Sequence, residues 1–383
     1  MEQPHISVAI PMLGEAVNLD SLLDCLRRQT CRTFSLYVCV NQPETWHLSN
    51  NEWQQSVVSD NLLTLKRLSQ VNDINLTIID RSSKGHGWPD KASGVGQARK
   101  ALMERIAAEH DDNEIVVSLD ADTDFAADYI RQAAGAVGHD GASGALCTPY
   151  YHRLAGDQRI DRTLLRYECY MRHYMVNMLE IGSPYAFTAL GSAMAFTLKA
   201  YRHAGGITPL QGGEDFYLMQ KLAKCGRIAL LGGTVYPQGR VSRRVPFGTG
   251  PAVAMSMDSQ AAKYPFYAKK AFQSVKETYD LFPILFERDV ETPMSAFLRE
   301  QLKTDDPWRP LRRNFKTPQL FVRACKERVD GLRILQFVRS LDCHDPASLD
   351  FANDPIDSLD SYRDHLFAKE MHLRAEVGAV GLS

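Results

Sequence analysis

Two pairs of acidic residues have the spacing of a catalytic site: Asp120 with Asp122, and Glu214 with Asp215. The first pair ends the apolar run 115–119, whose composition is typical of a strand buried in a parallel sheet. Alternation along a strand would point Asp120 and Asp122 to the same face. Their mutual repulsion would be relieved by a shared Mg²⁺ or Mn²⁺ ion, which prefers oxygen ligands. The alternative is a solvated loop that caps the next helix.

The second acidic pair follows Gly212 and Gly213 and opens a predicted helix over 215–225. A carboxylate at the mouth of a cleft can act as a general base toward a hydroxyl nucleophile. Acidic residues at a helix start are also favoured by the helix dipole without any catalytic role. Combined with the first pair, the pattern favours the catalytic interpretation.

A third candidate is the loop 239–250, which carries Arg240, Arg243 and Arg244 among glycines. Guanidinium groups bind phosphates in a fork geometry, and glycines leave backbone N–H groups accessible to an anion. The loop therefore predicts a pyrophosphate contact. The alternative is a solvated turn.

Two other nucleotide-binding patterns do not fit. Gly94 and Gly96 follow a long loop, and no third glycine completes a dinucleotide fingerprint. The sequence has no GxxxxGK[ST] loop, which excludes a P-loop nucleotidase. The segment 11–15 also lacks the glycine-rich, basic character with which a nucleotidyltransferase holds a triphosphate.

The elements that must position the acidic pairs alternate between strand and helix. Apolar runs at 6–10, 34–40, 76–79 and 115–119 are separated by helical patterns. This order predicts an α/β domain with a mainly parallel sheet, in which ligands bind at the carboxyl ends of the strands. From about residue 258 only helical patterns follow. We therefore expect a domain over 1–257, with a donor half at about 1–125 and an acceptor half at about 126–257, and a helical region over 258–383.

Composition sets broad limits on function. The chain has 383 residues, 44% of them hydrophobic, and a formal net charge of −2. These values are typical of a globular protein and give no sign of a nucleic-acid partner. The eight cysteines show no CxxC spacing, which favours reduced thiols and a cytoplasmic location. No secretory signal or membrane-spanning stretch is visible, so we expect a soluble or peripheral protein.

Taken in order, the motifs resemble GT-A-fold glycosyltransferases, and among them the inverting family 2. The resemblance covers roughly residues 5–250 and rests on segments in the expected order. They are the strand Ile6–Pro11 with Glu15, the DxD at 120–122, the stretch 191–196, Gly205-Gly206 and Gly213-Glu214-Asp215. It implies a Rossmann-like, mainly parallel mixed sheet flanked by helices. It also implies an enzyme that transfers a hexosyl group from a nucleoside-diphosphate sugar to an acceptor hydroxyl, with Mn²⁺ or Mg²⁺.

The resemblance also implies a role for individual residues. Asp122 would be the main metal ligand, and Asp120 would contact the metal or the ribose. Asp215 would deprotonate the acceptor, with Glu214 sharing or shaping that site. The remaining donor contacts would come from Pro11, Glu15, Asn41, Asp80, Lys91, Arg240, Arg243 and Arg244.

The sequence departs from the family pattern in three places. Asn41-Gln42 stands where many relatives carry an acidic pair, and the downstream histidine metal ligand is not evident after Asp215. The QxxRW motif of processive members is missing from the region 238–244, which favours a single-addition enzyme. Two alternatives are a nucleotidyltransferase of the same fold and a catalytically silent sugar-nucleotide-binding or scaffold protein.

The region after residue 258 lies outside the resemblance. The segment 309–339 is rich in arginine and lysine with interleaved apolar residues. Such a segment can rest on an anionic membrane that holds a lipid-linked acceptor, or it can pack as an ordinary helix with a solvated basic face. The sugar, the nucleobase and the acceptor (glycan, lipid-linked or small molecule) are not readable from the sequence.

Overall fold

The computed structural model describes residues 5–137, 143–239, 264, 266–341, 343 and 355–380. The chain forms two compact units. The first comprises Met1–Tyr167 and Phe187–Gln260, and the second comprises Glu168–Ala186 and Ala261–Ser383. Helix α5 (Gln158–Glu180) contributes residues to both. The predicted division at residue 257 into functional regions stays a prediction.

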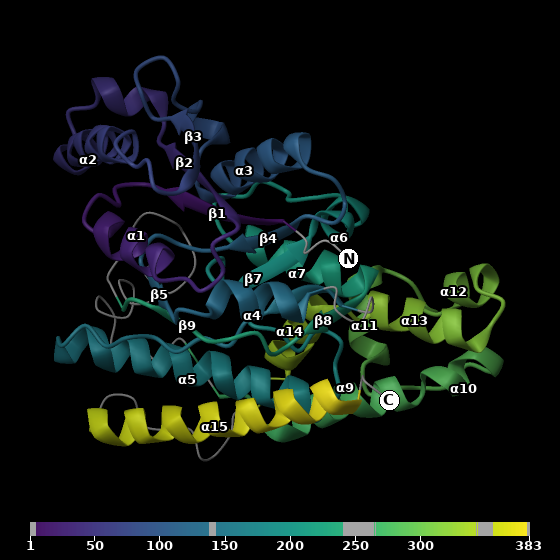
Figure 1. Ribbon diagram of the computed structural model, residues 1–383. Helices are drawn as coiled ribbons and strands as arrows, with labels where there is room; N and C mark the ends of the chain where they lie inside the picture. Colours follow the sequence, from purple (N-terminus) through teal and green to yellow (C-terminus); the bar gives the residue numbers. More distant parts are fainter. Residues whose placement is uncertain are drawn as a thin grey trace. The chain divides into compact units, whose positions relative to one another are not determined.

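The first unit is built on a seven-stranded sheet with the order β3-β2-β1-β4-β7-β6-β8 (Figure 1). The pairs β1–β2, β2–β3, β1–β4 and β6–β8 are parallel, and β7 runs antiparallel to both β4 and β6. The predicted α/β fold with a mainly parallel mixed sheet flanked by helices is confirmed. The strands are β1 (Ile6–Met12), β2 (Phe34–Asn41), β3 (Asn75–Arg81), β4 (Ile115–Ser118), β6 (Ser143–Cys147), β7 (Met194–Thr197) and β8 (Arg227–Ala229).

The central strands are buried along their whole length, as their aliphatic, β-branched sequences require. Every residue of β1, β2 and β4 is buried. Helix α3 packs on β1 and β2, α2 on β2, and α4 on β4. The helices of this unit are α1 (Leu19–Arg27), α2 (Glu52–Leu68), α3 (Val95–Glu109), α4 (Tyr129–Ala136), α6 (Leu198–His203), α7 (Glu214–Cys225), and the short η1 (Glu44–Leu48) and η2 (Asp90–Ala92).

A second, two-stranded sheet joins β5 (Thr123–Phe125) to β9 (Val235–Pro237) in antiparallel pairing. The register places Thr123 opposite Pro237. This small sheet therefore joins the chain just after the first acidic pair to the chain just before the predicted basic loop.

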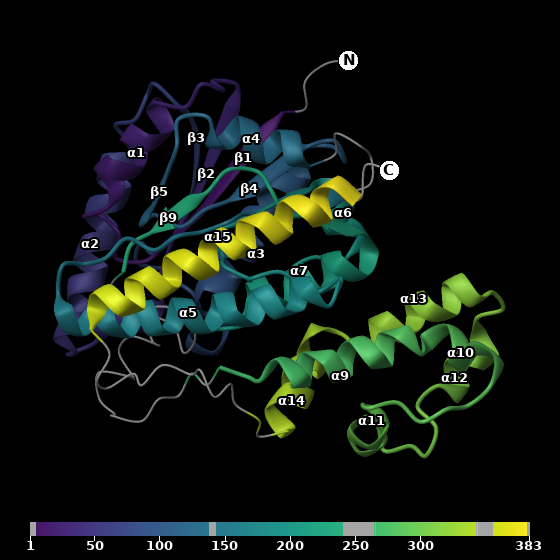
Figure 2. The ribbon, with the colours of Figure 1, turned by 90° about the horizontal axis from the view of Figure 1, so that it is seen from below.

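In the described part of the second unit the regular elements are helices. They are the second part of α5 with α9 (Lys269–Asp280), α10 (Phe282–Glu287), α11 (Ser295–Leu302), α12 (Arg309–Asn314), α13 (Pro318–Arg328), α14 (Gly331–Ser340) and α15 (Ile356–Val380). Helix α15 runs beside α5 in both views (Figure 1 and Figure 2). Between them Arg172 pairs with Glu168 and Glu370, and all three side chains are fully buried. Buried charges need such partners, since an unpaired charge in the interior is strongly destabilising.

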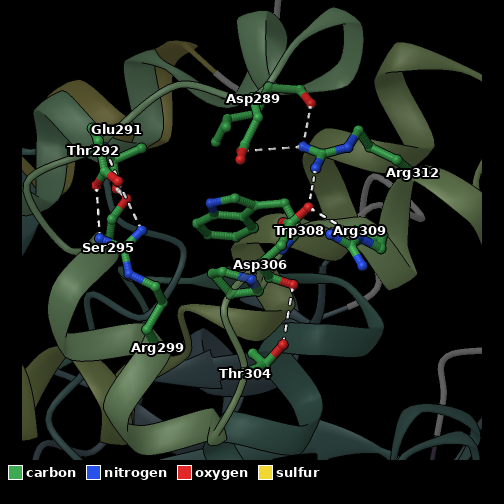
Figure 3. A network of polar contacts seen from close by, with 12 residues as sticks. Asp289, Glu291, Thr292, Ser295, Arg299, Thr304, Asp306, Trp308, Arg309 and Arg312 are labelled. Atoms are coloured by element: carbon green, nitrogen blue, oxygen red, sulfur yellow. Dashed lines mark hydrogen bonds and ion pairs between the residues drawn. The ribbon is translucent and has the colours of Figure 1, made fainter.

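The turn before α12 is organised around Asp306 and the buried indole of Trp308 (Figure 3). One oxygen of Asp306 accepts hydrogen bonds from the backbone N–H groups of Trp308 and Arg309, both at 2.9 Å. Its other oxygen pairs with Arg312. The acid therefore satisfies the first N–H groups of the helix and holds a cation at the same time.

Several cations of the basic segment 309–339 are thus engaged within their own unit. Besides Arg312, Arg323 pairs with Glu327, and Arg339 donates to the hydroxyl of Tyr267. Among the residues that the structure describes, no helix is long and apolar enough to cross a membrane. Contact with a membrane surface stays a prediction.

Candidate active site

The sheet order places the ends of four adjacent parallel strands at one edge. Met12 ends β1 opposite Val40, and Asn41 ends β2 opposite Arg81 at the end of β3. Residues Glu15, Asn41, Asp80 and Asp120, each predicted from sequence as part of the site, therefore gather at the carboxyl edge of the sheet. Ligand sites in open α/β sheets lie at this edge.

The first acidic pair does not sit on the strand itself, so the expectation from strand alternation is wrong. Strand β4 ends at Ser118, and the chain then turns, with the N–H of Thr123 donating to the carbonyl of Asp120 at 3.2 Å. The orientation of Asp120 and Asp122 is therefore set by this turn. Both side chains remain partly exposed, so a divalent ion could reach their oxygen atoms from solvent.

The start of the basic loop lies beside the same turn. The backbone N–H of Gln238 donates to the carbonyl of Asp122 at 3.1 Å, which continues the β5–β9 pairing by one residue. Arg240, Arg243 and Arg244 follow Gln238 in sequence but lie outside the described residues. Their contact with a pyrophosphate stays a prediction.

A buried arginine, Arg99 on α3, joins the two acidic pairs. Its side chain is 3% exposed, its Nη1 contacts Glu214 Oε1 at 2.8 Å, and its Nη2 pairs with Asp120. Burial alone would lower the pKa of Arg99, but the charges of Asp120 and Glu214 outweigh that effect and raise it. The guanidinium is therefore a permanent cation between the two carboxylates.

Room for this cation is left by a glycine. A Cβ on Gly191 would lie 1.8 Å from Arg99 Nη2, a distance no side chain can occupy. The carbonyl of Gly191 is held by the hydroxyl of Ser118, the last residue of β4, at 2.8 Å. Gly191, the first residue of the stretch 191–196, has no side chain, and this leaves the space that the guanidinium of Arg99 occupies.

Two further glycines, Gly96 at the start of α3 and Gly213 before α7, help to position the second acidic pair. A Cβ on Gly96 would lie 2.2 Å from the carbonyl oxygen of Leu210, so the first turn of α3 packs directly on the segment before Glu214. Gly213 then adopts φ 80°, a left-handed conformation, at the N-cap of α7. Gly96 and Gly213 therefore deliver Glu214 and Asp215 to the site.

Burial changes the protonation of the second acidic pair. Desolvation raises the pKa of Asp215 to about 7, with a further contribution from the charge of Glu214 and an opposing one from Arg99. Desolvation also raises the pKa of Glu214, and the nearby Arg99 partly offsets it. A carboxyl whose pKa lies near neutrality is suited to accept a proton and release it again.

The other predicted donor contacts vary in their surroundings. Pro11 is buried within β1, and Glu15, 7% exposed, accepts from Asn18 Nδ2 at 2.6 Å. The amide of Asn41 donates to the carbonyl of Met12 at 2.9 Å and so ties the ends of β2 and β1 together.

Asp80 and Lys91 flank the long loop that follows β3. Burial would raise the pKa of Asp80, but hydrogen bonds from Ser83 and Ser82 lower it below its ordinary value. Lys91 is exposed on η2. The loop between them is anchored by Glu44, whose carboxylate accepts from the N–H groups of Gly85 and Gly87, both at 2.8 Å.

Asp124, the third acid of the cluster, does not cap the helix that follows. Helix α4 has Asp128 at its N-cap, and the side chain of Asp128 makes no capping hydrogen bond. Asp124 instead lies in β5, where its Oδ2 contacts Arg153 Nε at 2.9 Å. A residue in a strand cannot supply the cap of a helix four residues later.

The sequence predicted no functional role for Arg99, and it placed Gly191 in the stretch 191–196 without showing that this glycine makes room for a cation. Arg99 occupies a helix whose neighbouring buried positions are Ala98, Leu102 and Met103. A charged residue on such an apolar face must have a buried partner, and this was the available signal. The identity of the partner could not be read from it.

No family model matches this sequence, and a comparison with curated proteins gives no match. Among solved structures, the fold is similar to that of S. aureus TarS residues 1–349 in complex with UDP-GlcNAc. The two share 14% identity with a TM-score of 0.42, over 88% of this chain and 92% of TarS 1–349.

It is also similar to a mannosyltransferase from Pyrobaculum calidifontis in complex with GDP-Man and Mn²⁺. That pair shares 16% identity with a TM-score of 0.38, over 97% of this chain and 87% of the other. At these identities the similarity concerns the fold alone.

Proposed function

We propose that this protein is a metal-dependent, inverting glycosyltransferase that moves a hexosyl group from a nucleoside-diphosphate sugar to an acceptor hydroxyl, one sugar at a time. The observation that carries the proposal is the Asp120–Arg99–Glu214 connection. Arg99 connects the acidic turn at Asp120, whose oxygen ligands suit a metal ion, to Glu214, which adjoins Asp215. The pKa of Asp215 is raised to about 7. A transferase needs both functions on opposite sides of the same anomeric carbon.

On the donor side, Asp122 is the main ligand for Mn²⁺ or Mg²⁺. Asp120 already gives one oxygen to Arg99, so it is the weaker ligand and contacts the metal or the ribose with its remaining capacity. The oxygen-only character and partial exposure of this pair fit a hard divalent ion. When bound, the ion neutralises the pyrophosphate and stabilises the charge on the departing nucleoside diphosphate.

The rest of the donor lies along the carboxyl edge of the sheet. Pro11, Asn41 and Asp80 lie near the carboxyl ends of β1, β2 and β3, and Glu15 lies in the loop after β1, so we assign these four residues to the nucleoside. Lys91 and the arginines at 240, 243 and 244 are the proposed pyrophosphate contacts.

On the acceptor side, Asp215 removes the proton of the attacking hydroxyl. The oxygen of the acceptor bonds to the anomeric carbon as the bond to the leaving phosphate breaks, and the proton passes to the carboxylate of Asp215. Attack from the side opposite the leaving group inverts the anomeric configuration. Arg99 holds Glu214 in place, and the positive charge of Arg99 opposes the rise in the pKa of Asp215.

A donor panel tests the proposal and separates it from its alternatives. The full chain is incubated with UDP-, GDP- and dTDP-sugars in the presence of Mn²⁺, first for thermal stabilisation and then for turnover. A donor that binds the folded state raises the melting temperature by mass action. Release of a nucleoside diphosphate supports the glycosyltransferase. Release of pyrophosphate would indicate a nucleotidyltransferase, and donor binding without turnover a silent binding protein.

A further inference from the structure

A second cluster of ligand-type side chains lies at the other end of the central strands, away from the acidic turn. His5 immediately precedes β1, Glu114 immediately precedes β4, and His110 follows the last residue of α3. Because β1 and β4 are parallel and pair from Ile6 with Ile115, their first residues are neighbours. The cluster therefore belongs to the amino edge of the sheet, opposite the candidate active site.

The three side chains point their ligand atoms at one another. His5 Nδ1 lies 2.9 Å from Glu114 Oε1, and His110 Nδ1 lies 3.2 Å from Glu114 Oε2. The two imidazole rings are stacked at 4.8 Å between centroids. Among the described residues these are the one group of three or more His, Cys, Asp or Glu side chains that could hold a metal ion, with one ligand atom from each lying within 4.8 Å of the others.

The hydrogen bonds around His110 direct its Nδ1 toward the carboxylate of Glu114. The hydroxyl of Tyr37 donates its one proton to Glu109 Oε2 at 2.7 Å, since a carboxylate can only accept. Nε2 of His110, 2.9 Å from the same hydroxyl oxygen, must therefore be the donor in that contact. In a neutral ring the lone pair of Nδ1 then faces a carboxylate oxygen of Glu114. Two acceptors in contact repel, so a proton or a metal ion must lie between them.

The other two members of the cluster are oriented in the same way by outer partners. His5 Nε2 contacts the hydroxyl of Ser35 at 3.2 Å, and Asn75 Nδ2 holds that hydroxyl at 2.7 Å. Glu114, 3% exposed, accepts from the hydroxyl of Ser7. Ring nitrogens fixed from the far side by hydrogen bonds are the usual surroundings of metal-bound histidines.

We propose that His5 Nδ1, His110 Nδ1 and the carboxylate of Glu114 form a binding site for a divalent transition-metal ion of the zinc class. Two imidazoles with one carboxylate are ligands that Zn²⁺ takes in preference to Mg²⁺ or Ca²⁺. The side chain of His5 is 42% exposed, which leaves a fourth position open to water. The ion joins the starts of β1 and β4 to the end of α3, so its role is to stabilise the sheet.

Binding replaces protons with the ion. His5 presents the lone pair of Nδ1 to the ion and carries its single ring proton on Nε2 facing Ser35, and any second ring proton passes to solvent. His110 already carries its proton on Nε2, and any second proton on Nδ1 is released. Glu114 binds as the carboxylate. The assembled site holds a +2 ion, one carboxylate and two neutral rings.

The test is calorimetric titration of the chelator-treated full chain with ZnCl₂. We expect one zinc per chain at this site and a rise in melting temperature on addition of zinc. His5→Gln and His110→Gln should each weaken the zinc affinity at least about tenfold, and Tyr37→Phe by about 10- to 100-fold because an outer-shell partner is lost. His203→Gln, which changes an exposed histidine on α6, is the matched control and should leave the affinity unchanged.

Two further comparisons make the result decisive. Zinc binding should persist in Asp122→Ala, which separates this site from the acidic turn and from the proposed transferase activity. His5→Gln alters an exposed side chain at the start of a strand, so it remains informative if His110→Gln fails to fold. Absence of zinc binding by the wild-type chain, or equal affinity in wild type and His5→Gln, would overturn the proposal.

Discussion

The guanidinium of Arg99 passes through the space that a side chain at Gly191 would fill. A Cβ there would lie 1.8 Å from Nη2 and 2.3 Å from Cζ. Gly191 is held in turn by Ser118 at the end of β4, so the cation is fixed against the strand that delivers Asp120. The position of the buried cation, and with it the spacing of the two acidic pairs, depends on a glycine.

Replacing that glycine should disable the site. Gly191→Ala must displace Arg99 or the strand beside it, and overpacking of this kind costs about 1–3 kcal/mol of stability. Displacement of the catalytic groups by about 1 Å can lower activity about 100-fold. Denaturant unfolding and donor turnover measure the two effects. Gly135→Ala is the control, because nothing lies within 4 Å of a Cβ at that exposed helical position, and it should leave both unchanged or slightly raise stability.

Removal of the Arg99 guanidinium should cost more stability than removal of the Glu214 carboxylate that it pairs with. Arg99→Met leaves Glu214 buried without its partner, and breaking a buried pair from one side costs about 3–5 kcal/mol. Adding Glu214→Gln removes the stranded charge and should restore part of that loss. A double-mutant cycle on the free energy of unfolding checks this coupling. Strictly additive effects would contradict a direct Arg99–Glu214 interaction.

Of Asp122 and Asp124, only Asp122 should be needed for metal-dependent transfer. Asp122→Ala should abolish transfer and the metal-dependent part of donor affinity, since the ion's contact with the pyrophosphate is worth several kcal/mol. Donor titrations with and without Mn²⁺ measure this. Asp124→Asn is the matched control: Asp124 lies two residues away and pairs with Arg153. Full turnover by Asp122→Ala would rule out its role as the main metal ligand.

Loss of the proposed base should spare donor binding. Asp215→Asn should lower kcat by about 10²- to 10⁴-fold while the donor dissociation constant stays close to that of the wild type. In the wild type the proton-accepting form of Asp215 is lost as pH falls through its pKa of about 7. We therefore expect kcat/KM to fall about tenfold per pH unit below that value. Loss of donor affinity in Asp215→Asn would show that the base assignment is wrong.

The same pKa has a consequence for stability. The folded state raises the pKa of Asp215 from 3.8 to about 7, so folding favours the protonated acid. The stability that Asp215 contributes to the folded state is fully present below pH 3.8 and is lost as the pH rises through about 7. Asp215→Asn should therefore stabilise the protein at pH 8 and have little effect at pH 4. Melting temperatures of both proteins across this range measure the difference.

The sequence alone determined the sheet and its chemistry-bearing edge. Runs of aliphatic residues at β1, β2 and β4 predict buried strands, because a short continuous apolar run is typical of a strand covered on both faces. Acids that follow such strands must lie at the carboxyl edge, whatever the details of the turn. Asp120 was predicted in this way, whereas the Glu214–Asp215 pair was predicted from the glycines before it and from the helix that it opens; the left-handed conformation of Gly213 is visible only in the structure.

Only the tertiary structure decided which charges meet. Arg99 and Glu214 are separated by 115 residues, and His5 and Glu114 by 109. No local pattern encodes such pairings, because a side chain's partner depends on how distant segments pack and not on its own neighbours in sequence. The turn after Ser118 and the space at Gly191 are likewise set by packing. The sequence thus supplies the reactive groups, and the fold decides which of them form ion pairs with one another.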